Sequence, residues 1–270
     1  MKYIAMMILA LLVFLMSYFG LQAFAHAKSY EESTLKLAVD RSVKMQAEYQ
    51  TRSLAEKLSL GYYTNEKRIF REKIEKQRAW HKERAKSYLI NAMVTLSVIL
   101  LSSFVAGLQL FTFFGSLSAM IVLYLGLFTP LLMVTIHKEV EYIGDVVLSF
   151  ESKSVLGSVV KLFDSGDTTV ALVILLFSVL IPVVKTLLMM LVVVVMESRF
   201  AHGIVKFFKL IGKWSMIDVF VVATLLVYLT GNGSSVSHAE VQAGLYFFLA
   251  YVIVSMLVSL SADKMLKRRG

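Results

Sequence analysis

Long apolar runs recur along the chain and constrain its fold more than any other feature. The first covers residues 4–24, residues 89–136 are apolar almost throughout, and three more runs lie between residues 168 and 262. A run of about 18 or more apolar residues is long enough to cross a bilayer as a helix. Overall, 57% of the 270 residues are hydrophobic, above the roughly 45–50% of an average soluble domain. We therefore expect an all-α polytopic membrane protein.

The stretch 89–136 is too long for a single crossing. At about 1.5 Å per residue it would extend well beyond a hydrocarbon core about 30 Å thick. Small and polar residues between Gly107 and Ser116 mark the expected break. We predict an additional transmembrane helix with a short loop over 88–112, followed by a four-helix transmembrane unit within 113–266. The helices of that unit are predicted at about 113–136, 168–196, 213–230 and 240–262.

The first apolar run has the features of an export signal. It follows Lys2 and ends in Ala23-Phe24-Ala25-His26-Ala27, which contains two overlapping A-x-A patterns, as at signal-peptide cleavage sites. Its apolar part is long for a signal peptide. Residues 1–27 are therefore either a signal peptide or an uncleaved signal-anchor helix, and both alternatives deliver the following segment to the non-cytoplasmic side.

Residues 28–87 differ from the rest because they are densely charged and contain no long apolar run. Acidic residues precede basic ones at i,i+4 spacing, the order that stabilises helices. Residues 61–65 (GYYTN) have the composition of a turn. We predict a charged helical hairpin whose second arm continues into the next membrane helix, and which is either a docking arm for a partner or a solvated insertion. The four pairs are Glu32–Lys36, Asp40–Lys44, Glu48–Arg52 and Glu72–Lys76.

A small extramembrane β-segment is predicted at 137–160. Between Val140 and Phe150, apolar residues fall mainly on even positions and polar ones on odd positions, which is the period of a strand with one covered face. From residue 155 the apolar spacing becomes helical. A turn of sequence DSGD then follows, and its members Asp164, Gly166 and Asp167 form a candidate loop motif near the membrane.

The distribution of basic residues indicates how the chain crosses the membrane. The formal net charge is +9, and among the later loops 197–213 and the C-terminal end carry four Lys or Arg each, whereas 231–238 has none. Residues 28–87 are also strongly basic, but the positive-inside rule weakens for segments of about 60 residues, so the shorter loops decide. Because basic loops stay in the cytoplasm, we place 197–213 and the C-terminus there. Counting crossings then places 137–167 and 28–87 in the periplasm. Basic flanks facing anionic lipid explain the charge better than nucleic-acid binding, since no aromatic–basic RNA-binding signature occurs.

A few polar residues interrupt the predicted membrane helices. Lys185 follows Pro182 by three residues, Ser178 precedes Pro182 by one turn, and Asp218 follows Ser215 in a later helix. Charged residues at membrane depth usually face a cavity or a partner, which makes them functional candidates. Proline tends to kink its helix and to free a backbone carbonyl for a nearby polar group.

Lys185 and Asp218 are the expected pair, although their depths differ by up to about two helical turns. Such a pair either serves function or only fixes how two helices pack. Asp218 also lies near a helix N-terminus, where the helix dipole favours negative charge. Beside it, Trp214 has the position of an interfacial anchor and Lys213 that of a snorkelling flank.

Several kinds of chemistry find no support in the sequence. There is no cysteine, which excludes disulfides, thiolate metal sites and cysteine nucleophiles. No P-loop, H-E-x-x-H, G-x-S-x-G or G-x-G-x-x-G motif occurs, and the five histidines are scattered without ligand spacing. We expect no enzyme activity, no metal and no cofactor.

Two segments resemble the paraquat-inducible protein A family, which includes the LetA-like membrane proteins. They are VLGSVVKLFDSGDTTVALVILLFSVLIPVVK (155–185) and LIGKWSMIDVFVVATLL (210–226), with FTPLLMVTI (128–136) and LSADKML (260–266) as weaker matches. The shared pattern is a short amphipathic helix, F-D-S-G-D before a membrane helix, S-V-L-I-P-V-V-K within it, and then G-K-W-S-M-I-D-V-F. The resemblance covers roughly 113–266, which is one four-helix unit.

The resemblance implies a protein of the bacterial inner membrane that works in phospholipid trafficking between the inner and outer membranes. It also implies a periplasmic MCE-domain partner that forms the lipid tunnel. It suggests that a polar pocket in the bundle is lined by Lys185, Asp218, Ser215, Ser178 and Pro182. Family members often carry cysteine-rich zinc ribbons and two tandem units. This chain has neither, so zinc is not carried over. We expect such a single-unit member to act alone, as a homo-oligomer or with the MCE partner.

Two hypotheses about function follow. In the first, the protein is a component of phospholipid transport and envelope lipid homeostasis, whose buried Lys185 and Asp218 bind a headgroup or relay protons. In the second, it is a non-transporting scaffold or stress sensor that acts through the basic hairpin 28–87, with the bundle as an anchor.

Overall fold

The computed structural model describes residues 2–58, 66–140, 144–194 and 237–267. Helices dominate these residues, and a small three-stranded sheet accompanies them. Five described helical spans are long and apolar enough to cross a membrane, which confirms the expected all-α polytopic class. The membrane helix predicted at 213–230 lies outside the described residues.

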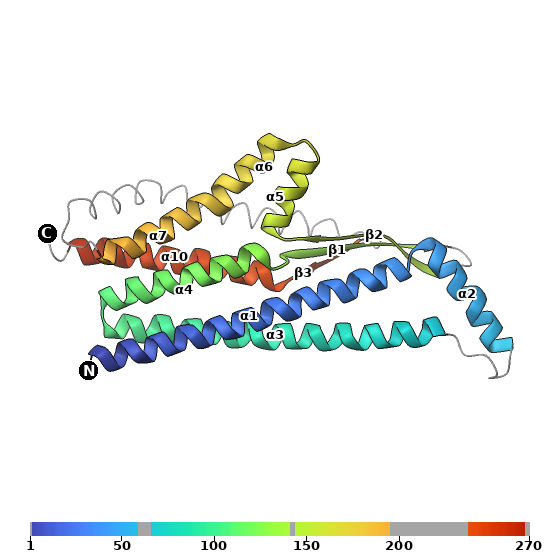
Figure 1. Ribbon diagram of the computed structural model, residues 1–270, viewed down its shortest axis with the longest axis horizontal. Helices are drawn as coiled ribbons and strands as arrows, with labels where there is room; N and C mark the ends of the chain where they lie inside the picture. The colour runs from blue at the N-terminus through green and yellow to red at the C-terminus, as the bar shows by residue number, and fades with distance from the viewer. Residues whose placement is uncertain (1, 59–65, 141–143, 195–236, 268–270) are drawn as a thin grey trace.

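Two long antiparallel helices at the start of the chain form a hairpin (Figure 1). α1 (Lys2–Asp40) runs without interruption from the apolar run into the charged segment, α2 (Val43–Leu58) follows at the outer end, and α3 (Glu66–Ala106) returns beside α1. α3 therefore combines the second arm of the predicted hairpin with the predicted additional membrane helix. Its 41 residues extend about 60 Å, roughly twice the hydrocarbon thickness.

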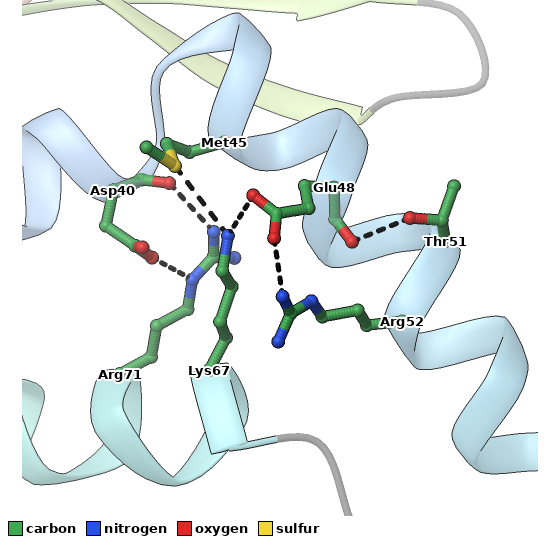
Figure 2. Close-up of polar contacts among 7 residues, drawn as sticks. All are labelled: Asp40, Met45, Glu48, Thr51, Arg52, Lys67 and Arg71. Carbon is green, nitrogen blue, oxygen red and sulfur yellow. Dashed lines mark hydrogen bonds and ion pairs between the residues drawn. The ribbon is translucent and has the colours of Figure 1, made fainter.

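Ion pairs hold the outer tip of this hairpin together (Figure 2). Arg71 of α3 pairs with the Asp40 carboxylate at the end of α1 and also donates to the Asp40 carbonyl. Lys67 of α3 pairs with Glu48 of α2, and its hydrogen bond is the main cause of the lowered pKa of Glu48. Glu48 also accepts from Arg52 at 2.8 Å, which confirms the predicted i,i+4 pair.

α4 (Leu108–Phe128) is the central helix of the bundle. It begins directly after Gly107, whose φ of +122° favours glycine, so a single residue separates it from α3. In its most apolar stretch 72% of the residues are buried, against 22% for α1 and 28% for α3. The break predicted near Gly107 is confirmed, but the helix starts at residue 108 rather than 113.

The helix predicted at 113–136 is also wrong at its C-terminal end. α4 ends at Phe128, Pro130 follows, and a strand begins at Leu132. Proline offers no backbone N–H and disfavours a helical conformation in the residue before it. The apolar run continues past the helix because this strand lies in the middle of the sheet, where both edges are paired. A short apolar run does not distinguish a buried strand from a helix.

The sheet has the order β2-β1-β3 and is antiparallel throughout. It consists of β1 (Leu132–Val140), β2 (Gly144–Lys153) and β3 (Ser237–Val241), so the β-segment predicted at 137–160 contains one full strand and the end of another. A bulge shifts the register of β2, and there the N–H of Val147 donates to the Arg41 carbonyl at 2.9 Å. The break between α1 and α2 therefore covers part of this edge strand.

The remaining described helices complete the bundle. The predicted short amphipathic helix is confirmed as α5, whose N-terminus is capped by the Ser154 hydroxyl accepting from Gly157 N–H at 3.0 Å. The next membrane span is a continuous helix with a π-helical turn, and the last one directly follows β3. The elements are α5 (Val155–Asp164), α6 (Thr168–Ile174), η1 (Leu175–Leu180), α7 (Ile181–Val194) and α10 (Ala243–Lys267).

The two segments that the charge pattern assigns to the periplasm lie at the same end of the bundle (Figure 1). The tip of the hairpin, the sheet and α5 all occupy that end. The start of α1, the turn between α3 and α4, and the end of α10 occupy the other. This arrangement agrees with the predicted location of both segments on one side of the membrane.

A carboxylate on β3 fastens the hairpin to the sheet. Glu240 accepts a hydrogen bond from the Tyr30 hydroxyl of α1 at 2.6 Å, and it pairs with Lys82 of α3 at 3.3 Å. Partial burial acts to raise the pKa of Glu240, but the bond from Tyr30 and the charges of Lys82 and Arg78 outweigh burial and lower it. We refer to Tyr30, Lys82 and Glu240 as the clasp.

α4 and α10 approach each other closely through two glycines. A Cβ on Gly126 would lie 2.8 Å from the backbone N of Phe248, and a Cβ on Gly244 would lie 2.4 Å from the Thr129 carbonyl oxygen. Small residues allow such close backbone contact between membrane helices. A buried hydrogen bond from Thr112 to Ser261, 3.0 Å long, joins the same two helices nearer the other end.

We expect Gly126→Ala and Gly244→Ala to lower the thermal transition of the detergent-solubilised protein. Each new methyl group meets backbone atoms that cannot rotate away, and overpacking typically costs about 1–3 kcal/mol, more than the roughly 0.5–1 kcal/mol that alanine gains in a helix. Gly20→Ala is the matched control, because its new Cβ would meet only the end of the Leu125 side chain. Equal transitions for all three variants would contradict the close contact.

The clasp predicts a pH dependence of stability. The folded-state pKa of Glu240 lies below its ordinary value of 4.5, so its contribution is present above that value and is lost as the pH falls through the lower folded-state value. We expect Glu240→Gln to reduce the acid-induced fall of the thermal transition between pH 6 and pH 3.5, whereas Glu72→Gln on the exposed face of α3 should not. The measurement is the transition temperature of each variant across that range.

Candidate functional site

α7 and α10 pack together, and polar side chains between them form a buried cluster. On α7, Lys185 is 8% exposed and Thr186 is 4% exposed; on α10, Tyr251 is 2% exposed and Ser255 is 6% exposed. All four lie within helical spans that are apolar enough to cross the membrane. We refer to these side chains, together with the carbonyl of Pro182, as the polar cluster.

The backbone before Pro182 is distorted in a specific way. The N–H of Ile181 donates to the Leu176 carbonyl, an i→i−5 bond, and the preceding six residues form the π-helical turn η1. Proline provides no N–H for the helical ladder, and π-helical turns are a common way to accommodate a local disruption. The distortion predicted from Pro182 is therefore present as a π-helical turn, and Ser178 lies half-buried within it.

The Pro182 carbonyl accepts bonds from both helices. Thr186 Oγ1 donates to it at 2.8 Å, and the Tyr251 hydroxyl donates to it at 3.1 Å. The two hydroxyl oxygens lie 3.3 Å apart. Lys185 Nζ donates to Ser255 Oγ at 3.5 Å, and Ser255 Oγ donates to the carbonyl three residues earlier at 3.1 Å. The cluster thus joins α7 to α10 by polar contacts inside an apolar bundle.

Lys185 dominates the electrostatics of the polar cluster. An ammonium group at membrane depth costs several kcal/mol unless polar groups replace its water, and the hydroxyl of Ser255 is one of the groups that do so. A phosphate or carboxylate brought beside Lys185 would gain a charge-assisted hydrogen bond in a medium of low dielectric constant. The arrangement is therefore chemically suited to hold an anion or to exchange a proton.

The predicted partner of Lys185 lies outside the described residues. Asp218 belongs to that part of the chain, as do Ser215, Trp214 and Lys213. The pairing of Lys185 with Asp218 therefore stays a prediction.

Sequence reasoning missed the three hydroxyl groups of the cluster. Thr186 directly follows Lys185, and a threonine in an apolar helix attracts little attention because its hydroxyl can bond to its own backbone. Tyr251 and Ser255 are spaced i,i+4 on α10, which places them on one face of the helix. That spacing, in a helix with few other polar residues, was the signal that could have identified them.

The candidate loop motif forms the turn between α5 and α6. Gly166 has a φ of +88°, in the left-handed region that favours glycine. The N–H groups of Gly166 and Asp167 donate to carbonyls near the end of α5, and Asp164 is the last residue of that helix. The conformation of the turn thus accounts for the glycine in this motif.

The part of the chain that matches a known family begins close to the boundary between α3 and α4. The family model of paraquat-inducible protein A matches residues 112–267, which is more than half of the chain and runs from the first turns of α4 to the last residue of α10. The chain belongs to the paraquat-inducible protein A family. The polar cluster lies inside the matched region, whereas α1, α2 and α3 lie outside it.

Several curated proteins are similar to part of the chain. The intermembrane transport protein PqiA of Escherichia coli K12 and that of Shigella flexneri are each 30% identical over 127 residues, which are 45% of this chain and 30% of the relative. A probable intermembrane transport protein of Haemophilus influenzae is 28% identical over 119 residues, which are 42% of this chain and 28% of the relative. The chain thus aligns with less than a third of the length of these relatives. No solved structure gives a significant match.

The burial of Lys185 predicts an unusual effect on stability. We expect the double variant Lys185→Met/Asp218→Leu to leave the thermal transition unchanged or to raise it, because replacing both members of a buried pair by apolar residues is often neutral or stabilising by about 1–4 kcal/mol. Met189→Ala, at a buried position one turn along α7, should instead cost about 2–5 kcal/mol and shows that the assay detects lost packing. A loss for the double variant as large as that for Met189→Ala would assign the predicted pair a structural role.

Proposed function

We propose that this protein is an inner-membrane component of phospholipid transport and envelope lipid homeostasis, with the polar cluster as the working part. The observation that carries the proposal is the buried Lys185, which donates to the Ser255 hydroxyl within a polar cluster between two membrane helices. This residue lies in the region matched by the paraquat-inducible protein A family model, and curated relatives of the chain are named for intermembrane transport. A charge at so costly a position in a membrane helix is a functional candidate by default.

The chemistry of the polar cluster fits a phospholipid headgroup. A phosphate is bound well by an ammonium group together with hydroxyl donors. Lys185 supplies the ammonium group, and the hydroxyls of Tyr251 and Ser255, which donate to backbone carbonyls in this structure, would turn toward the phosphate. We propose that Asp218 neutralises Lys185 when no headgroup is bound, and that Ser178 and Ser215 extend the polar lining. The headgroup would then replace Asp218 as the partner of Lys185.

The proposed orientation places the sheet and the hairpin tip in the periplasm and the C-terminus in the cytoplasm. It is supported by the basic loop 197–213 and by the grouping of the predicted periplasmic segments at one end of the bundle. A periplasmic MCE-domain partner or a second copy of the chain would meet the protein at that end. The proposed role is transport and requires no catalytic residue.

The experiment compares two lysines in a strain that lacks the gene and is complemented by each variant. We expect Lys185→Met to lose the rescue of outer-membrane barrier function, measured as sensitivity to detergent and to large antibiotics. Lys161 lies on the surface of α5 and pairs with Glu151 of β2 at 2.9 Å. We expect Lys161→Met to rescue fully. Because both variants remove one positive charge, the comparison isolates the position of the charge.

The proposal is wrong if the buried charges can be removed without effect. Full rescue by Lys185→Met, together with full rescue by Asp218→Asn, would show that the buried charges are not needed for envelope function. Protein levels in the membrane are measured in parallel, so that loss of rescue is not confused with loss of the protein.

A second candidate function is a scaffold or stress sensor that acts through the hairpin. The observation that favours it is that α1, α2 and α3 lie outside the family match and extend past the bundle (Figure 1). Replacing residues 43–65 by a short Gly-Ser linker removes the tip and leaves the clasp and the bundle. If this variant still rescues barrier function, the transport hypothesis is supported. If it fails to rescue at normal protein levels, the scaffold hypothesis is supported.

A further inference from the structure

A cavity of about 610 Å³ lies between the hairpin and the start of α10. Its walls come from α1 and α3 on one side and from β3 and α10 on the other. The volume falls within the roughly 300–1,000 Å³ range of small-molecule sites. This cavity is separate from the polar cluster, since the two share no lining residue. We refer to it as the hairpin pocket.

The polarity of the hairpin pocket changes along its length. On α3, Lys82 and Lys86 line the outer part, while Ile90 and Val94 continue the same face of the helix into the apolar part. These four residues are spaced i,i+4, so they form one stripe that extends about 18 Å along the helix. The stripe is charged at its outer end and apolar at its inner end.

The opposite wall changes polarity at the same level. Glu240 and Gln242 line the outer part, and Ala243 and Tyr246 of α10 line the part nearer the membrane. Lys86 is the last charged residue of α3, and α10 has no charged residue before Asp263. Both walls therefore pass from polar to apolar together, which places the pocket at the outer boundary of the membrane.

The charges around the outer part of the pocket are balanced. Lys82 and Lys86 are accompanied by Glu83 and Glu240 among the lining residues. Glu240 is already held by Tyr30 and Lys82 in the clasp. A ligand that carried only negative charge would meet two carboxylates, whereas a ligand with both a phosphate and an amine matches each charge with its opposite.

From these observations we propose that the hairpin pocket binds a phospholipid with an amine in its headgroup. The phosphate contacts Lys86 and Lys82, the amine contacts Glu83, and one acyl chain lies along Ile90 and Val94. The ligand comes from the outer leaflet, because the apolar end of the pocket continues into the membrane-spanning parts of α3 and α10. The clasp lies beside the headgroup, so the bound lipid lies where the hairpin meets the sheet.

The site deepens the proposed function by adding a second lipid position outside the polar cluster. The inference rests on the proposed function only in taking a phospholipid as the ligand. Lipid binding at the pocket is measured directly and does not require that transport occurs. The Lys185→Met variant separates the two sites, because it alters the polar cluster and leaves every lining residue of the hairpin pocket in place.

The headgroup is tested by native mass spectrometry of the full chain in detergent. The protein is offered phosphatidylethanolamine, phosphatidylglycerol and diacylglycerol with identical acyl chains. We expect phosphatidylethanolamine to be retained about tenfold over diacylglycerol, and Lys86→Glu to reduce its retention about tenfold. Lys76→Glu makes the same charge change at an exposed position of α3 that does not line the pocket, and it should retain the lipid as the unaltered protein does.

The acyl chain is tested by filling the apolar end of the pocket. We expect Val94→Trp to reduce retention of phosphatidylethanolamine about tenfold, which is the effect of displacing about two methylene groups. Met256→Trp is the control, since Met256 is exposed on α10 and does not line the pocket. The helical content of each variant is checked by circular dichroism.

Three results would overturn the inference. Equal lipid retention by Lys86→Glu and Lys76→Glu would rule out the proposed contact between Lys86 and the phosphate. Stronger retention of phosphatidylglycerol than of phosphatidylethanolamine would rule out the proposed contact between Glu83 and the amine. Loss of retention in Lys185→Met, with normal retention in Val94→Trp, would place the bound lipid in the polar cluster. Normal retention in Lys185→Met supports a separate site, whatever the outcome of the envelope assay.

Discussion

The backbones of α4 and α10 meet where the bundle joins the sheet, and the rest of the structure depends on this contact. Gly126 and Gly244 allow the close approach, and the N–H of Gly244 donates to the Pro130 carbonyl at 2.9 Å. β1 directly follows α4, and β3 directly precedes α10. One contact therefore sets both the packing of two membrane helices and the pairing of two strands. Any substituent that separated the helices would also strain the pairing of β1 with β3.

α10 takes part in both of the sites described above. Its first turn lines the hairpin pocket at Ala243 and Tyr246, and its middle carries Tyr251 and Ser255 of the polar cluster. The helix rises about 1.5 Å per residue, so Tyr246 and Ser255 are separated by about 14 Å along the axis. A lipid held at the outer boundary and a charge held inside the bundle are thus attached to one rigid element.

The sequence was informative where one residue type is unusual in its surroundings. A lysine in an apolar run is costly enough to stand out, so Lys185 was identified, and the φ requirement at Gly107 coincided with a predicted break. Leu132 and its apolar neighbours were assigned to a helix because a central strand and a buried helix have similar compositions. β3 was missed because its five residues are mostly polar and gain stability only by pairing with β1. The hairpin pocket could not be found from the sequence, since residues 27 and 246 meet only in the folded chain.

α3 is a single uninterrupted helix from the hairpin tip to the inner end of its membrane span. Its charged part, from Glu66 to Ser87, extends about 30 Å beyond the apolar part. The same helix therefore carries the basic residues of the tip, the lysines of the pocket and the apolar wall of the pocket. If a partner tilted the tip, α3 would move as a rigid body and would shift Lys86 and Val94 with it. Contact made some 30 Å from the membrane would in this way change the shape of a cavity at the membrane surface.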